Sequence, residues 1–430
     1  MIRRLKAGTP ELEEFLAMSY AGLEDIQARV DDIGKEIRAR GDEAVFEFTR
    51  KFDGAEIGPH NFRVTEREID EAYAAVDDRF LSALLAALEN ISLFHQKQLR
   101  NSWMEPDEMG NIVGQLYRPL RRVGIYVPGG TAAYPSSVLM NAIPAAVAGV
   151  EEIVMVTPPD ASGKVNPYTL VAASEAGVDE IYKMGGAQAV FALAWGTGTV
   201  PRVDKITGPG NIYVTLAKKA VYGDADIDML AGPSEILIIA DQTANPAYLA
   251  ADMMSQAEHD VLARAVLVTD SEEIIDQVEA EIKQQLPSLS RRSIIEQALR
   301  DYGAFILVEN LEEACQVANR VAPEHLEVVV EHPFAWLGNI KNAGAIFLGE
   351  NTPEPVGDYY AGPNHILPTG GTARFYSPVT VDTFLKKSSV LFYSRKGLQA
   401  SRQDIITLAE VEGLTAHANS IRVRREDIPE

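Results

Sequence analysis

Apolar side chains recur three and four positions apart along the N-terminal part of the chain, and charged residues fill the positions between them. This spacing puts the apolar residues on one face of an α-helix, so it predicts amphipathic helices. The two clearest runs are Leu23, Ile26, Val30, Ile33 and Ile37, and then Ile69, Tyr73, Val76, Phe80, Leu84 and Leu88. We therefore expect a helical N-terminal segment.

After Arg122 the pattern changes to short β-branched runs that alternate with helical stretches. Strands buried on both faces of a parallel sheet are apolar along their whole length, and each crossover between them needs a helix. The runs are Gly124–Val127, Ile153–Val156, Ile181–Met184, Ile236–Ile239, Ala265–Val268, Phe305–Val308 and Val328–Val330. A break near Asp228–Pro233 begins a second alternating series, and the pattern becomes helical again beyond Ser377. The chain is therefore expected to be an α/β protein with two parallel-sheet units.

The composition narrows the class of partner. The 430 residues include 39 Lys and Arg against 62 Asp and Glu, a formal net charge of −23, which argues against nucleic acid and anionic membranes. The uncharged stretch Val123–Val150 contains three prolines and is expected to be buried interior rather than a membrane helix. Acidic residues follow the basic N-terminus where a signal peptide would be apolar, so we do not expect secretion. Cys315 is the only cysteine, which excludes an intrachain disulfide and favours a reducing, cytoplasmic location.

Three glycine-rich turns each stand between a predicted strand and a predicted helix, at Gly129-Gly130, Gly185-Gly186 and Gly208–Gly210. Backbone N–H groups and the helix dipole at such a turn suit a pyrophosphate, although a tight turn alone also explains the glycines. The usual nucleotide fingerprints are absent, since even the turn at Gly208 lacks the third glycine. The residues alone leave nucleotide binding open.

Pairs of polar residues carry the candidate chemistry. Gln256 and His259 are three apart on a predicted helix and project from one face, which suits two ligands of one cation as well as a solvated surface. Glu324 and His325 precede the run that ends at Val330, near a strand end where α/β proteins commonly build active sites. An imidazole there can take a proton and a carboxylate can orient it or activate water, although an exposed turn explains the pair equally simply.

Two further pairs lie toward the C-terminus. Asp358 and His365 bracket a loop with a tight turn, so both side chains can point into one cleft. Glu412 and His417 stand at a predicted helix boundary. The nitrogen and oxygen donors that suit Zn²⁺ or a related divalent ion are Gln256, His259, Asp358 and His417.

Over essentially its whole length the chain resembles histidinol dehydrogenase, the zinc- and NAD-dependent family that completes histidine biosynthesis. The resemblance rests on several motifs in order rather than on any one of them. These motifs are Arg118–Gly130, Gly185–Ala189, Thr207–Asn211, Ala231–Glu235, Gln256–His259, Ala322–Leu326, Gly357–Pro368 and Glu412–His417.

The resemblance implies a role for each candidate residue. One Zn²⁺ per subunit would be bound by Gln256, His259, Asp358 and His417. His325 would be the general base and Glu324 would activate water. The implied substrate contacts are these metal ligands together with Ser234, His325, His365 and Glu412, and the implied NAD⁺ contacts are Tyr126, Gln188 and Asn211.

The implied reaction converts L-histidinol, two NAD⁺ and water to L-histidine and two NADH through a bound L-histidinaldehyde. Zinc would orient the amine and imidazole nitrogens of the substrate rather than activate the reacting oxygen. The family is a homodimer in which the C-terminal segment reaches the other subunit. Glu412 and His417 are therefore expected to complete the site of the neighbouring subunit.

The expected architecture is two incomplete, doubly wound Rossmann-like domains. A helical segment would cover residues 1–24, and residues 25–125 and 235–378 would form the first domain, with the metal and catalytic residues. Residues 126–234 would form the second domain, on the NAD side, and residues 379–430 a small helical extension that reaches the partner subunit.

Two alternatives remain. A related enzyme that oxidises another alcohol twice, such as a dihydroxypropane sulfonate, would call for Arg or Lys where this chain offers Ser234, His365 and Glu412. A non-catalytic metal or small-molecule binding protein is the other, since fold does not fix function. Simple binding, however, has no evident need for Glu324 beside His325.

Overall fold

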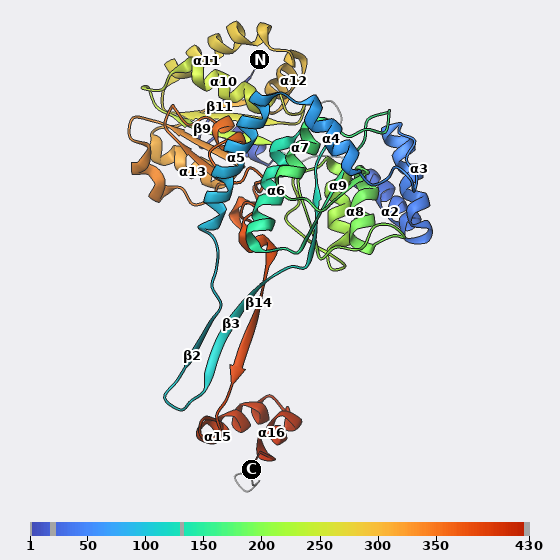
Figure 1. Ribbon diagram of the computed structural model, residues 1–430. Helices are drawn as coiled ribbons and strands as arrows, with labels where there is room; N and C mark the ends of the chain where they lie inside the picture. The colour runs from blue at the N-terminus through green and yellow to red at the C-terminus, as the bar shows by residue number, and fades with distance from the viewer. Residues whose placement is uncertain (1, 18–22, 130–132, 425–430) are drawn as a thin grey trace. The chain divides into compact units, whose positions relative to one another are not determined.

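The computed structural model describes residues 2–17, 23–129 and 133–424. The chain forms two compact units, one of Met1–Leu99 with Leu120–Phe384 and one of Arg100–Pro119 with Leu385–Glu430. The larger unit holds both parallel sheets (Figure 1). Among the described helices, none is long and apolar enough to cross a membrane.

A five-stranded parallel sheet has two strands on each side of its central strand β4. In spatial order the strands are β6 (Glu180–Lys183), β5 (Glu152–Thr157), β4 (Arg122–Tyr126), β7 (Lys205–Thr207) and β8 (Asp226–Ile227). Almost every residue of β4 and β5 is buried, which explains their continuous apolar sequence.

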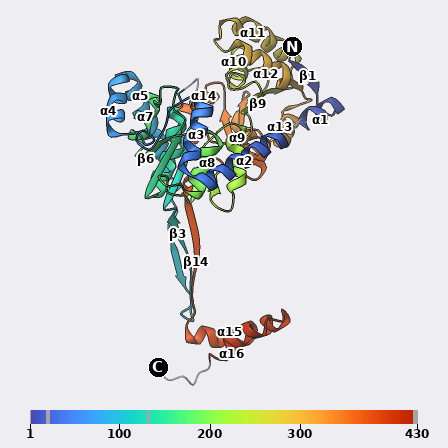
Figure 2. The same ribbon diagram turned by 90° about the vertical axis from the view of Figure 1, so that its right-hand side faces the viewer.

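Helices cover both faces of this sheet (Figure 2). One layer consists of α2 (Leu23–Arg40), α3 (Asp42–Asp53), α8 (Gly186–Trp195) and α9 (Ile212–Val221). The other consists of α4 (Glu66–Ala75), α5 (Asp78–Gln96), α6 (Pro135–Ala148) and α7 (Pro167–Glu175). The predicted grouping of residues 25–125 with 235–378 stays a prediction, and these helix contacts favour grouping α2 to α5 with residues 126–234 instead.

A six-stranded parallel sheet lies in the same unit, with three strands on one side of β9 and two on the other. In spatial order the strands are β1 (Arg3–Lys6), β11 (Ala304–Leu307), β10 (Arg264–Thr269), β9 (Glu235–Ala240), β12 (His325–Val329) and β13 (Ala345–Leu348). Its helices are α10 (Pro246–Ala257), α11 (Glu272–Gln285) and α12 (Arg292–Tyr302) on one face, and α1 (Pro10–Leu16) and α13 (Leu311–Val321) on the other (Figure 1). Both sheets are doubly wound about a central strand, which confirms the predicted fold class.

Strand β1 corrects one part of the prediction. Residues 1–24 were expected to be helical, and this is wrong for Arg3–Lys6, which pairs in parallel with β11 from Ala304 to Leu307. Four residues of mixed polarity carry neither a helical nor a strand period, so pairing with a sheet edge decides their conformation. The helical expectation holds from α1 through α5.

The smaller unit contains an antiparallel sheet in the order β14 (Leu385–Phe392), β3 (Ile112–Pro119) and β2 (Trp103–Pro106), followed by α15 (Arg395–Val411) and α16 (Thr415–Arg422). The helices of this extension were predicted, whereas its strands were not. Most side chains of β14 and all of those in β2 are exposed, so the alternation that identifies a half-buried strand is absent.

Candidate active site

Glu324 and His325, the two predicted catalytic residues, are both buried at the beginning of β12. Backbone groups of Glu235, at the start of the adjacent strand β9, hold both of them. Its N–H donates to Glu324 Oε2 at 2.9 Å, and its carbonyl oxygen lies 3.2 Å from His325 Nδ1. A carbonyl oxygen can only accept, so Nδ1 carries a proton, and in the neutral ring Nε2 is the nitrogen with the lone pair. The site thus lies at the amino edge of the sheet, not at the carboxyl edge where α/β folds usually bind ligands.

Helix α14 (Glu354–Tyr359) supplies two carboxylates to this imidazole. His325 Nε2 lies 3.5 Å from Asp358 Oδ1 and 4.0 Å from Glu354 Oε1, and it has no hydrogen-bond partner. Ligand atoms of these three residues all lie within 4.8 Å of one another, as in a metal site. Glu354 was missed from the sequence, although a carboxylate four residues before Asp358 on a helix projects from the same face.

Two of the predicted metal ligands come from α10 and the turn that follows it. Gln256 is fully buried, and with its amide nitrogen facing Glu354 it donates to both carboxylate oxygens at 3.0 Å. His259 lies close enough for the charges of Asp358 and His325 to act on it, although loss of solvent is the main reason that its pKa is lowered. The structure therefore gathers Gln256, His259 and Asp358 around His325. Their nitrogen and oxygen donors, beside the unpartnered Nε2, fit a divalent cation.

Burial and charge set the protonation of this group. Burial raises the pKa of Glu324 to about 8, against the effect of the neighbouring His325. Burial also raises the pKa of Glu354, to about 7, again opposed by His325. Loss of solvent alone would lower the pKa of His325, but the charges of Glu324 and Glu354 outweigh it and raise that pKa well above its ordinary value. So many buried carboxylates around one imidazole favour a cationic ligand.

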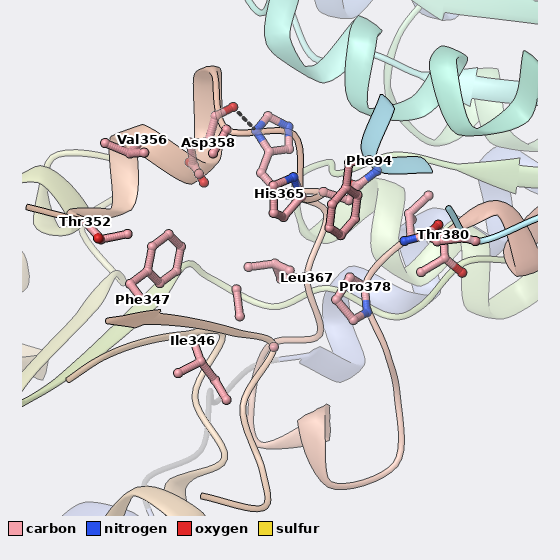
Figure 3. A pocket seen from close by; sticks show the side chains of 18 residues that line it. Phe94, Ile346, Phe347, Thr352, Val356, Asp358, His365, Leu367, Pro378 and Thr380 are labelled. Carbon is pink, nitrogen blue, oxygen red and sulfur yellow. Dashed lines mark hydrogen bonds between the residues drawn. The ribbon is translucent and has the colours of Figure 1, made fainter. Parts of the chain in front are cut away.

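His365, a further predicted substrate contact, lies against the backbone of Asp358. Its Nδ1 is 3.0 Å from the Asp358 carbonyl oxygen (Figure 3). Its Nε2 is 3.4 Å from Ser137 Oγ on α6. Ser234, the remaining predicted substrate contact in this unit, is half-buried and directly precedes Glu235 at the start of β9. In the larger unit, the residues predicted around the substrate thus come from the six-stranded sheet, from α10 and the turn after it, and from the segment that follows β13.

A cavity of about 300 Å³ adjoins Asp358 and His365 (Figure 3). Its walls are largely apolar, with Phe94 from α5, Phe347 from β13 and Leu367 from the loop that follows α14. Asp358, His365, Asn364 and Gln98 are among the few polar side chains that line it. A small organic molecule with polar groups at one end suits such a cavity.

Glu412 and His417 belong to the smaller unit. Glu412 is the C-cap residue of α15, His417 lies in α16, and both side chains are exposed. Their predicted places in the substrate and metal sites therefore stay predictions.

The predicted cofactor residues gather at the carboxyl edge of the five-stranded sheet, where β4 and β7 are neighbours and the winding reverses. Tyr126 ends β4, and its hydroxyl accepts from Gly186 N, at the start of α8, at 3.0 Å. Gln188 lies in the first turn of α8, is buried, and has no partner for either amide atom. Asn211 caps α9. A buried amide without partners fits a cofactor contact, because such a group is costly unless a ligand satisfies it.

Two of the predicted glycine turns lie wholly within the described residues, while Gly130 of the third does not. Gly208 has a φ of +114°, and a Cβ there would lie 2.1 Å from the Tyr126 carbonyl oxygen. The buried ion pair of Lys218 and Asp228 holds the backbone of Gly208. Lys218 Nζ donates to Gly208 O at 3.0 Å, and Gly208 N donates to Asp228 Oδ2 at 2.8 Å. The turn is thus fixed against Tyr126 and leads directly to Asn211.

Gly208→Ala is expected to destabilise the fold by at least about 3 kcal/mol, because the added methyl group collides with backbone that cannot yield. Gly223→Ala is the matched control: its φ is +109°, but a Cβ there meets nothing within 4 Å. The control should cost only the left-handed strain of about 1–2 kcal/mol. Urea unfolding of both variants measures the difference, and equal losses would show that the close approach to Tyr126 costs nothing.

Comparisons of sequence and of structure with known proteins find the same family over almost the whole chain. A family model described as histidinol dehydrogenase matches residues 17–425. The histidinol dehydrogenase of Heliobacterium mobile is 61% identical over 426 residues, which cover 99% of this chain and 100% of that relative. The histidinol dehydrogenase of Bacillus subtilis is 54% identical over 408 residues, 95% of each chain. A crystal structure of histidinol dehydrogenase from Elizabethkingia anophelis superimposes with a TM-score of 0.94 at 40% identity, with 98% of both chains covered.

Proposed function

The chain belongs to the histidinol dehydrogenase family, and we propose that it oxidises L-histidinol to L-histidine, through a bound L-histidinaldehyde, with two NAD⁺ and water. The observation that carries this proposal is the buried pair Glu324 and His325, held by the backbone of Glu235, with His325 3.5 Å from Asp358, which lines a largely apolar cavity. Glu354 and Asp358 make the site acidic, which suits a cationic amino alcohol. Among the described residues that line the cavity there is no Lys or Arg, so a sulfonate substrate fits less well.

His325 is the general base of the first oxidation. Its Nδ1–H is held by the Glu235 carbonyl oxygen, so the unpartnered Nε2 is the atom that accepts the hydroxyl proton of L-histidinol. As this proton leaves the hydroxyl oxygen, hydride leaves the carbon atom that bears the hydroxyl group. Bound NAD⁺ supplies the hydride acceptor for both oxidations.

Glu324 serves the step between the two oxidations. Water must add to the aldehyde before a second hydride can leave, and that water needs a proton acceptor. Glu324 Oε2 lies 3.7 Å from His325 Nδ1 and accepts from Glu235 N, which orients the carboxylate. His325 thus takes the proton of the alcohol, and Glu324 takes the proton of the water that adds to the aldehyde.

Zn²⁺ is proposed to be bound by Gln256, His259 and Asp358, with His417 supplied by a second copy of the chain. The amide nitrogen of Gln256 donates to the Glu354 carboxylate, which leaves the amide oxygen available as a ligand. When bound, zinc supplies a fixed positive charge that orients the substrate nitrogens. Glu412 of the same second copy, with Ser234 and His365, is proposed to contact the substrate. The active protein would then be a homodimer.

NAD⁺ is proposed to lie against Tyr126, Gln188 and Asn211. No glycine fingerprint is needed for this pose, because the Gln188 amide and the first turn of α8 offer polar groups without one. The carboxyl edge of a doubly wound sheet is the usual place for a dinucleotide.

The test of the proposed function is the amount of NADH formed per L-histidinol consumed, followed by absorbance. We expect two NADH per substrate, loss of the activity after treatment with a chelator, and recovery when Zn²⁺ is added back. One NADH with release of free aldehyde would contradict the role of Glu324. No NADH from folded, zinc-loaded protein would reject the substrate and leave other alcohols or a binding function.

A further inference from the structure

Asp53 is a carboxylate in an unfavourable place. It is the last residue of α3, directly before Gly54, which ends the helix with a φ of +70°. Its Oδ2 is buried and has no hydrogen-bond partner. A negative charge at the C-terminus of a helix opposes the helix dipole, and an unpartnered buried acceptor costs the solvation it has lost. Burial accordingly raises the pKa of Asp53 to about 6.

The surroundings of Asp53 belong to the proposed NAD⁺ site. The pKa of Tyr126 is raised to about 12, mainly by burial, and the negatively charged Asp53 is among the groups that act on this phenol. The adjacent Gly54 faces the loop that follows β5, with 3.9 Å between a Cβ built there and Ala161 Cβ. The C-terminal end of α3, which carries Asp53, therefore lies beside the loop that follows β5, at the carboxyl edge of the sheet where Tyr126 ends β4.

A doubly wound sheet that binds NAD⁺ usually carries an acidic side chain at this place, where it hydrogen-bonds the ribose hydroxyls of the adenosine half. The segment after β5 has one carboxylate, Asp160, and its own turn uses it. Asp160 Oδ1 accepts from Ser162 N at 2.8 Å and from Lys164 N at 3.0 Å. The turn after β5 thus uses Oδ1 of its own exposed carboxylate, whereas Asp53 at the end of α3 offers an oxygen that is buried and unpartnered.

We propose that Asp53 binds the ribose hydroxyls of the adenosine half of NAD⁺ and, by its negative charge, excludes the 2′-phosphate of NADP⁺. Asp53 is thus the residue that selects the cofactor. This inference rests on the proposed function, since it assumes that the edge with Tyr126 and Gln188 binds a dinucleotide. It replaces the acidic residue of the usual fingerprint with one from a helix that precedes the whole sheet.

The test is a calorimetric titration with ADP-ribose and with 2′-phospho-ADP-ribose, which measures binding without catalysis. Wild-type protein is expected to bind the phosphorylated ligand at least about 30-fold more weakly, because the like charges repel. Asp53→Ala is expected to weaken ADP-ribose binding by about 10-fold, which is the loss of one hydrogen bond to a charged acceptor. Asp53→Asn keeps an acceptor, so it should lose the discrimination more than the affinity.

Glu56→Gln is the matched control, because it removes a carboxylate three residues away that pairs with Arg50 at the surface. It should leave both affinities unchanged. The proposal is overturned if Asp53→Ala leaves the ratio of the two affinities unaltered, or if Glu56→Gln changes it equally. If the Asp53 variants fail to fold, the binding of 2′-deoxy-ADP-ribose to wild-type protein is measured instead. If this ligand binds as tightly as ADP-ribose, the proposed contact with the ribose hydroxyls is rejected. Failure of wild-type protein to bind ADP-ribose at all would instead reject the NAD⁺ assignment in the proposed function.

Discussion

Replacing His325 with glutamine is expected to lower kcat for L-histidinol oxidation by about 10³-fold, within the range of a lost general base. Glutamine can still donate an amide N–H to the Glu235 carbonyl oxygen, but it offers no atom that takes up a proton near neutral pH. Affinity for the substrate should change little, because the contacts to its nitrogens lie elsewhere. Steady-state NADH formation gives kcat, and calorimetric titration with L-histidinol gives the affinity.

His332→Gln is the control for this experiment. His332 is an exposed imidazole at the start of the segment after β12, with its Nε2 4.0 Å from Glu331 Oε1, so its replacement should leave kcat unchanged. If His325→Gln retained more than about one tenth of the wild-type kcat, proton transfer by Nε2 would not be the role of His325. An equal loss in both variants would point to damage around β12 rather than to chemistry.

The sequence identified residues that meet at this site, but not where in the fold the site lies. Adjacency alone put Glu324 and His325 together, and no packing was needed to see an acid beside an imidazole. Their place at the amino edge of the sheet was not predicted, because an apolar run reveals a strand but not which of its ends lines a cavity. The site lies at this edge because β12 pairs in parallel with β9, which brings the backbone of Glu235 beside both side chains.

Glu354 illustrates what sequence patterns leave out. Its role depends on Gln256, which is about a hundred residues away and donates to both of its carboxylate oxygens only after α10 and α14 have packed. Likewise, the helical period of α2 predicts a helix but not the sheet that it covers. The cofactor edge was suggested by the glycine turns, whereas the orphaned amide of Gln188 and the carboxylate of Asp53 appear only in the folded chain.

Replacing Glu324 with glutamine is expected to separate the two oxidations. Glutamine keeps an oxygen that accepts from Glu235 N, and it resembles the protonated side chain that burial favours, since burial raises the pKa of Glu324 to about 8. The fold should therefore survive. Oxidation of L-histidinol to the aldehyde should persist, while oxidation of supplied L-histidinaldehyde should fall by about 10²- to 10³-fold, because water loses its proton acceptor.

The measurement is NADH formation from each of the two substrates, together with trapping of released aldehyde. A raised pKa means that the carboxylate, the form that accepts a proton, becomes populated only as the pH rises through about 8, so the wild-type rate of aldehyde oxidation should increase over that interval. The variant should lack this increase. If the variant oxidised both substrates at the wild-type rate, Glu324 would not activate water, and the proton would have to leave through His325 in both steps.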